Sequence, residues 1–144
     1  MTREDLKNYR GNKLWIEEQI ELYTEMKQRA EGFKAVVLDG MPKAKNKPNY
    51  AIENLIDKYN FIIEELASEQ EELNKIILQL KRVEEPYREI LTKFYIQGKK
   101  LVRVADEMNY TYDYTRRMNG IALDKFEKEA EKEETHKILQ NNTI

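Results

Sequence analysis

Apolar residues recur at alternating intervals of three and four positions between residues 52 and 83, and this spacing constrains the fold more than any other feature of the sequence. The stripe consists of Ile52, Leu55, Tyr59, Ile62, Leu66, Leu73, Ile76, Leu80 and Val83, with Glu69 as its polar member. Such spacing places side chains on one face of an α-helix. Ile56, Ile63 and Ile77 widen the stripe on one side. The sequence therefore predicts a long amphipathic helix over about residues 50–83 that buries more than a narrow seam.

A second and less regular stripe predicts a helix over about residues 3–32. Its members are Leu6, Tyr9, Ile16, Ile20, Tyr23 and Ala30, and a neighbouring stripe consists of Trp15, Leu22, Met26 and Phe33. Residues 33–49 contain Pro42 and Pro48 and have the composition of a loop. Two such helices joined by this loop predict an antiparallel helical hairpin over residues 1–83. Because two helices alone cannot bury stripes this wide, we expect a homodimer or packing against the rest of the chain.

Composition excludes several kinds of chemistry. The 144 residues include no cysteine and a single histidine, His136, which excludes thiolate sites, cysteine nucleophiles and histidine-rich zinc sites. No apolar run approaches the roughly 20 residues that span a bilayer. We therefore expect a cytoplasmic protein without enzymatic activity, cofactor, metal or membrane partner.

Residues 84–130 predict a separate module of short helices. Pro86 suits a first helical turn, and Gly98 can adopt the left-handed conformation that ends a helix. A short helix with Leu101, Val104, Ala105 and Met108 on one face follows, and small Ala105 marks where a second helix can cross closely. Residues 109–111 form a three-residue break in which Thr111 is a good N-cap. The next helix, about residues 112–126, completes a helix-turn-helix plan, and residues 131–144 are expected to form a polar tail.

Three short motifs carry a resemblance to a known family. Phe94-Tyr95-Ile96-Gln97-Gly98, then Val104-Ala105-Asp106-Glu107-Met108-Asn109-Tyr110-Thr111, then Ala122-Leu123 together resemble region 4 of bacterial sigma factors. The whole chain is similar to small phage-encoded transcription regulators, the late-gene and integrase activators of phages of Gram-positive bacteria. The resemblance implies an all-α protein that binds double-stranded DNA in the nucleoid of a bacterial host, with host RNA polymerase as a further partner.

The resemblance also assigns roles to individual positions. The residues that would face the major groove are Tyr112, Asp113, Arg116 and Arg117, and Thr111 would cap their helix. The residues that would lie near phosphate are Lys99, Lys100 and Arg103. Helical geometry at about 100° per residue groups Tyr112, Arg116 and Asn119 on one outward strip. The sequence departs from the family pattern at Asn109, where glycine is usual, and at Thr115, where an apolar residue is usual.

The charge of the module permits DNA binding but leaves other functions open. Residues 93–117 contain six basic and three acidic residues, a surplus that favours weak binding by one copy and stronger binding by a dimer. One alternative is a coiled-coil adaptor that binds RNA polymerase or a sigma factor. Another is a small terminase subunit that binds packaging-site DNA as a ring. Salt-dependent DNA binding distinguishes the regulator from the adaptor, and oligomer size distinguishes it from the terminase subunit.

Overall fold

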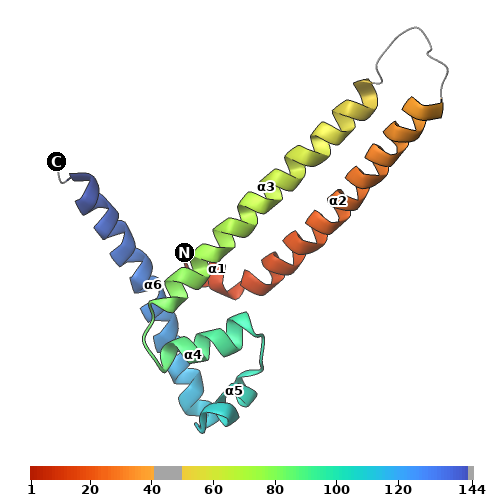
Figure 1. The fold of residues 1–144 in the computed structure, drawn as a ribbon. Coiled ribbons are helices and arrows are strands. Elements are labelled where there is room, and N and C mark those ends of the chain that lie inside the picture. The colour runs from red at the N-terminus through yellow and green to blue at the C-terminus, as the bar shows by residue number, and fades with distance from the viewer. Residues whose placement is uncertain (41–49, 143–144) are drawn as a thin grey trace. The chain divides into compact units, whose positions relative to one another are not determined.

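The computed structural model describes residues 1–40 and 50–142, and all regular structure in this part of the chain is helical (Figure 1). The all-α prediction is therefore confirmed. The elements are α1 (Arg3–Lys7), α2 (Tyr9–Gly40), α3 (Tyr50–Lys81), α4 (Tyr87–Leu91), the π-helix η1 (Thr92–Ile96), α5 (Leu101–Met108) and α6 (Tyr112–Asn142). None of the described helices is both long enough and apolar enough to cross a membrane.

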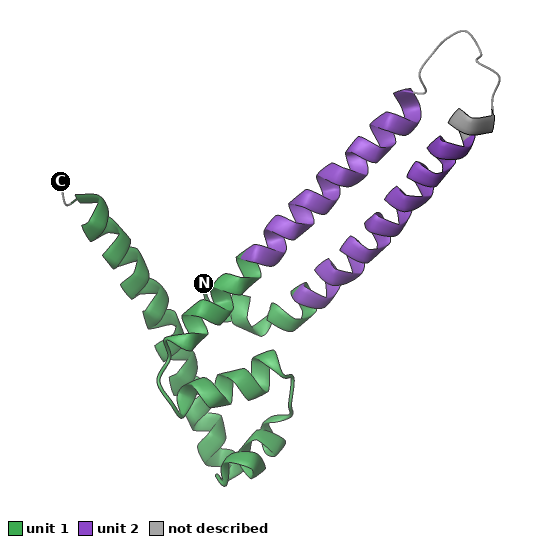
Figure 2. Ribbon diagram, viewed as in Figure 1, with its two compact units in different colours: residues 1–12, 72–144 green, residues 13–71 purple. Residues whose placement is uncertain are grey.

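The chain divides into two compact units (Figure 2). Unit 2 is residues 13–71, and unit 1 combines residues 1–12 with residues 72–144. This division differs from the predicted segments 1–83, 84–130 and 131–144, because the end of α3 belongs with the C-terminal helices. Gln79 of α3 is buried, and its Nε2 donates hydrogen bonds to the carbonyl oxygens of Met1 at 3.0 Å and Phe126 at 2.8 Å.

Unit 2 consists of α2 from residue 13 to its end and the first two thirds of α3. Lys34 Nζ lies 3.1 Å from Glu53 Oε1, and the rings of Tyr23 and Tyr59 lie 6.0 Å apart. The residue of higher number on α2 thus contacts the residue of lower number on α3, so the two helices are antiparallel within this unit. α2 runs to Gly40, eight residues beyond the predicted helix end at 32, and residues 41–49, which carry the rest of the predicted loop, lie outside the described residues.

Unit 1 has its core where α4, η1, α5 and α6 meet. Ile90, Val104 and Met118 form a buried cluster, and Tyr87, Phe94 and Met108 pack against it. Ala105 is also buried, on the helix that packs against α6. Pro86 occupies the N-cap position of α4 without a capping hydrogen bond, and it therefore lies one residue before the first helical turn, in which the sequence placed it.

The last helix is much longer than predicted. The sequence favours a recognition helix over residues 112–126, a charged helical extension over residues 127–134 and a polar tail, whereas α6 continues to Asn142. Ion pairs at helical spacing support the extension, between Lys132 and Glu129 at 3.2 Å and between Lys137 and Glu133 at 3.7 Å. Arg82, the residue after the end of α3, adds a third pair with Glu133 at 3.1 Å.

Candidate nucleic-acid interface

Local hydrogen bonds in the turn between α5 and α6 determine where α5 ends and where α6 begins. Asn109 has φ 59° and ψ 38°, the left-handed conformation that asparagine tolerates in place of glycine. The backbone N–H of Tyr110 then donates to the carbonyl of Ala105 at 2.9 Å, which closes the end of α5. The backbone N–H of Tyr114 donates to Thr111 Oγ1 at 3.2 Å, so Thr111 is the N-cap of α6 as predicted.

Thr115 shows how a polar residue occupies a usually apolar position. Its side chain is wholly buried, and its Oγ1 donates a hydrogen bond to the carbonyl of Thr111 at 2.9 Å. Because the hydroxyl is satisfied one turn back on its own helix, its burial leaves no unpaired donor. Thr115 can therefore replace an apolar residue without disrupting the core.

The first two turns of α6 expose the side chains that the resemblance assigns to the major groove. Tyr112, Asp113, Arg116 and Arg117 are all exposed, and Arg116 Nη2 lies 4.0 Å from Asp113 Oδ1. At about 100° per residue, Asp113, Arg117 and Gly120 lie opposite the buried side of α6. A side chain at Gly120 would meet no atom within 4 Å, so the surface there is open.

Asn119 does not belong to this exposed surface, and its predicted place on an outward strip is wrong. The residue is half-buried, and its Nδ2 donates to Tyr95 Oη at 3.1 Å. Four residues of helix place it about 40° from buried Thr115, which turns it toward η1. Further along α6, Asp124 pairs with Arg3 of α1 at 2.6 Å, and Arg3 also pairs with Glu127. The exposed surface at the start of α6 therefore ends near Gly120, and the acidic residues beyond it are paired with α1.

A carboxylate on α5 gathers three basic side chains, one from η1, one from the turn that follows η1 and one from α5 itself. Glu107 accepts hydrogen bonds from Lys93 at 2.8 Å and Lys99 at 2.9 Å, and Arg103 Nε lies 3.4 Å away. The bonds from Lys93 and Lys99 lower the pKa of Glu107 to about 2, against an ordinary value of 4.5. The same contact raises the pKa of Lys93. We call these four residues the Glu107 cluster.

The three residues predicted near phosphate therefore differ in their availability. Lys99 belongs to the Glu107 cluster, and only 24% of its side chain is exposed. Arg103 also belongs to the cluster, but 69% of its side chain is exposed. Lys100 lies outside the cluster and is exposed at the N-cap of α5. The role of Glu107 and Lys93 was missed, because they are fourteen residues apart and no local pattern links them.

The pKa of Glu107 predicts a specific acid sensitivity. A carboxylate whose pKa is lower in the folded state stabilises that state above its unfolded pKa, and this contribution disappears as pH falls from about 4.5 toward 2. We expect Glu107→Gln to lose less stability than the unmutated chain over this range. Urea unfolding at a series of pH values measures the difference. Asp106→Asn, a change at the exposed neighbouring carboxylate, is the control, and equal acid sensitivity in Glu107→Gln and the unmutated chain would contradict the cluster.

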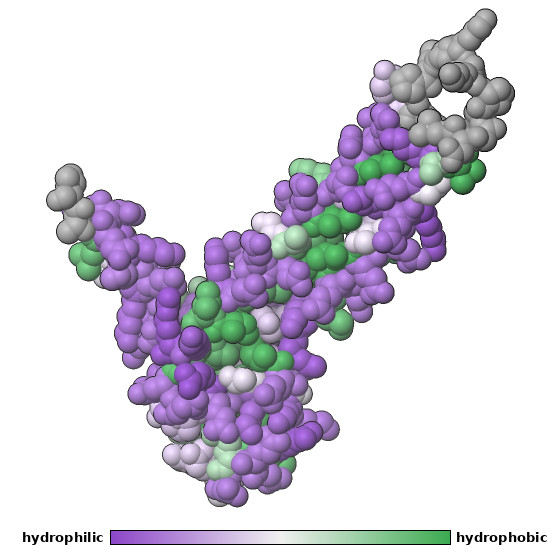
Figure 3. Space-filling model, viewed as in Figure 1, coloured by the Kyte–Doolittle hydropathy of each residue, from purple (hydrophilic) through white to green (hydrophobic). Residues whose placement is uncertain are grey.

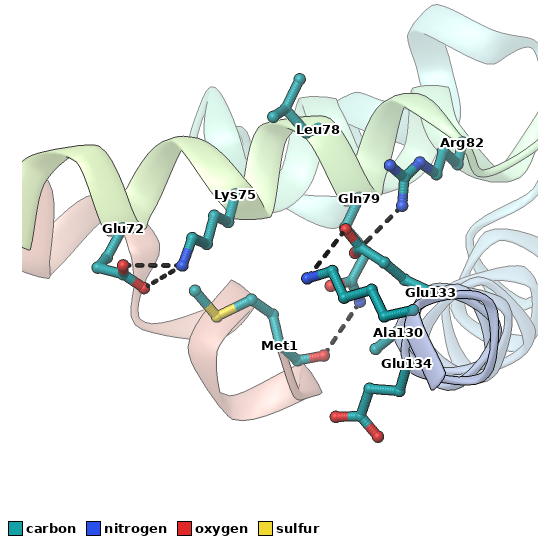
Figure 4. A pocket seen from close by; sticks show the side chains of 10 residues that line it. Met1, Glu72, Lys75, Leu78, Gln79, Arg82, Ala130, Glu133 and Glu134 are labelled. Carbon is teal, nitrogen blue, oxygen red and sulfur yellow. Dashed lines mark hydrogen bonds and ion pairs between the residues drawn. The ribbon is translucent and has the colours of Figure 1, made fainter. Parts of the chain in front are cut away.

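Unit 1 also contains a mixed-charge groove of about 460 Å³ between Met1, the end of α3 and the second half of α6 (Figure 4). Three ion pairs line it: Lys75 with Glu72 at 2.8 Å, and Arg82 and Lys137 with Glu133 at 3.1 Å and 3.7 Å. Since all three cations are paired with carboxylates of the groove itself, they offer no surplus charge to an anionic ligand. The exposed start of α6 with the flanking basic residues is the stronger candidate site.

Comparisons with known proteins add no relative. No family model, no curated protein and no solved structure matches the chain. The chemistry of the described residues therefore carries the functional proposal.

Proposed function

We propose that this chain is a phage or prophage transcription regulator that binds double-stranded DNA through α5, the turn and the start of α6. The observation that carries the proposal is the capped three-residue turn, which presents Arg116 and Arg117 on an exposed helix beside a basic flank. A helix presented in this way fits the major groove of B-form DNA. The likeness of residues 94–123 to sigma-factor region 4 supports the same function.

Arg116 is the proposed base-reading residue. Its side chain is 66% exposed, and its contact with Asp113 lies at the 4.0 Å limit of an ion pair. A guanidinium held this loosely can form two hydrogen bonds to guanine O6 and N7, which contributes roughly 1–3 kcal/mol of discrimination between bases. Tyr112, one turn earlier, offers an aromatic ring and a hydroxyl on the same strip, and open Gly120 lets the DNA approach closely.

Lys100 and Arg103 are the proposed phosphate contacts. Lys100 is exposed at the start of α5, and Arg103 is held near Glu107 without being covered. Contacts of this kind give affinity without sequence preference, and each makes binding more sensitive to salt. Glu107 keeps Lys93 and Lys99 in place beside them, so the cluster contributes positive charge as one rigid group.

Fluorescence anisotropy at several salt concentrations tests the proposal, with a DNA fragment from the protein's own locus and a random fragment of equal length. We expect Arg116→Ala to weaken binding to the specific site by roughly 5- to 150-fold, with a much smaller effect on random DNA. Lys100→Ala should weaken both alike and reduce the salt slope by about one unit. Lys128→Ala, which removes an exposed charge further along α6, is the matched control and should change neither. Negligible, salt-insensitive binding by the unmutated chain would contradict DNA recognition.

Exposed apolar side chains on the same segment favour a second candidate, the adaptor that binds RNA polymerase or a sigma factor. Val102 of α5 is 57% exposed, and Tyr114 and Ile121 of α6 are 47% and 45% exposed. Apolar surface of this kind suits a protein partner better than a phosphate backbone. Retained binding to purified RNA polymerase together with absent DNA binding would favour this function.

A further inference from the structure

α2 carries an apolar stripe that unit 2 does not cover. Trp15, Leu22 and Phe33 are 53%, 47% and 59% exposed, and Met26 between them is half-buried. At about 100° per residue, these four side chains lie roughly a quarter-turn from buried Ile16, which faces α3. We call these four residues the α2 stripe.

α3 extends the α2 stripe into a broader apolar face. Leu55 is 40% exposed and Ile62 is half-buried, and at about 100° per residue both lie to one side of buried Leu66, whereas Ile56 and Ile63 lie to its other side. In an antiparallel pair this rotation places Leu55 and Ile62 on the same side of the hairpin as the α2 stripe. Figure 3 shows hydrophobic side chains gathered lengthwise along the hairpin between hydrophilic flanks. Two helices cannot bury this face by themselves.

Charge is distributed unevenly along the same unit. Residues 13–25 of α2 contain four glutamates and one lysine, whereas residues 26–36 contain three basic residues and one glutamate. Residues 59–71, which lie beside the acidic half of α2, contain four glutamates and no basic residue. A second hairpin packed in the same direction would place acid against acid, and one packed in the opposite direction places the basic half of α2 against the acidic half of its partner.

We propose that a second copy of this chain covers this face, with its hairpin antiparallel and its α2 packed against α2. The stripe extends from Trp15 to Phe33, so complete overlap puts the two-fold axis near Thr24 and sets Trp15 against the partner's Phe33. A face about 27 Å long and two helices wide, about 20 Å, offers roughly 500 Å² per copy, so the pair buries about 1,000 Å² in total, the lower end of the range for specific interfaces. The proposal does not depend on DNA binding, because every residue that carries it belongs to unit 2.

Sedimentation equilibrium of the full chain tests whether a second copy covers the apolar face. We expect a dimer at micromolar concentration, and we expect Leu22→Glu to raise its dissociation constant about a hundredfold or more, because the interface would bury an unpaired carboxylate. Leu22 is half exposed within one chain, so the helical circular dichroism should be retained. Phe61→Glu is the matched control, because Phe61 is 63% exposed on the outer side of α3, and this variant should remain dimeric. A monomeric unmutated chain, or a ring larger than a dimer, would overturn the proposal.

Disulfide trapping tests the relative orientation of the two hairpins. Because the sequence contains no cysteine, only the introduced cysteines can form a disulfide. We expect Trp15→Cys mixed with Phe33→Cys to give a covalent dimer under mild oxidation, whereas each variant alone stays mostly uncrosslinked. The antiparallel arrangement brings these two positions together only between different copies and only in the mixture. A mixture that gives no more covalent dimer than either variant alone would overturn the antiparallel arrangement, even if sedimentation shows a dimer.

Discussion

Phe126→Ala is expected to lower the free energy of unfolding of unit 1 by about 3–5 kcal/mol, the usual cost of removing a buried aromatic ring. Phe126 heads the fully buried side chains of the described chain by volume, with 0% exposure. Its backbone carbonyl also accepts the hydrogen bond from Gln79, so α6 is fixed to α3 at the same residue. A cavity here removes ring contacts at a position that surrounding groups cannot shift to fill.

The measurement is urea unfolding followed by circular dichroism. Ile121→Ala removes an apolar side chain of the same helix that is 45% exposed, and we expect it to change stability by no more than about 0.5 kcal/mol. Because the chain has two units, their transitions need separate analysis. Equal stability losses in the two variants would show that Phe126 does not anchor α6.

Leu66→Lys is the second change with a large expected effect, and it acts on unit 2. Leu66 is 6% exposed, and Ile16, at 4%, is the other buried residue in the described part of this unit. An ammonium group in the seam must lose hydration or extend to solvent along its methylene chain. We expect the hairpin to lose stability on the order of 2–5 kcal/mol, in line with the loss of a buried leucine.

Thermal melting by circular dichroism measures this loss. Ala67→Lys, at the exposed adjacent position, is the control for the added charge and should melt like the unmutated chain. Unit 1 should keep its own transition in both variants. A hairpin that tolerates lysine at 66 would show that the α2–α3 seam contributes little to folding.

Signals that act within a few residues were readable from the sequence. The left-handed conformations appear at Gly98, with φ 70°, and at Asn109, with φ 59°. The Thr111 cap and the helical class follow from similarly local chemistry. These predictions are confirmed because the cause and the effect lie within one or two turns of the same chain segment.

Features that depend on distant partners were not readable. The sequence predicts that Lys99 is available to bind phosphate, but in the structure it is hydrogen-bonded to Glu107. Asp124 is likewise paired with Arg3, which lies at the opposite end of the sequence. Nothing near Gln79 in the sequence indicates that its side-chain amide donates hydrogen bonds to two backbone carbonyl groups. The charged run at residues 127–134 predicts a helical extension from its i,i+4 spacing, but the polar residues after it give no local signal that α6 continues to Asn142.

The position of Trp15 gives the chain a built-in optical reporter. It is the sole tryptophan of the sequence, and it lies on the α2 stripe with about half of its surface in water. Its indole emission should shift to shorter wavelength when the stripe is covered. DNA binding at α5 and the start of α6 should leave this emission unchanged. Association of the hairpins and binding of DNA can therefore be followed as two separate signals, one from intrinsic fluorescence and one from a labelled oligonucleotide.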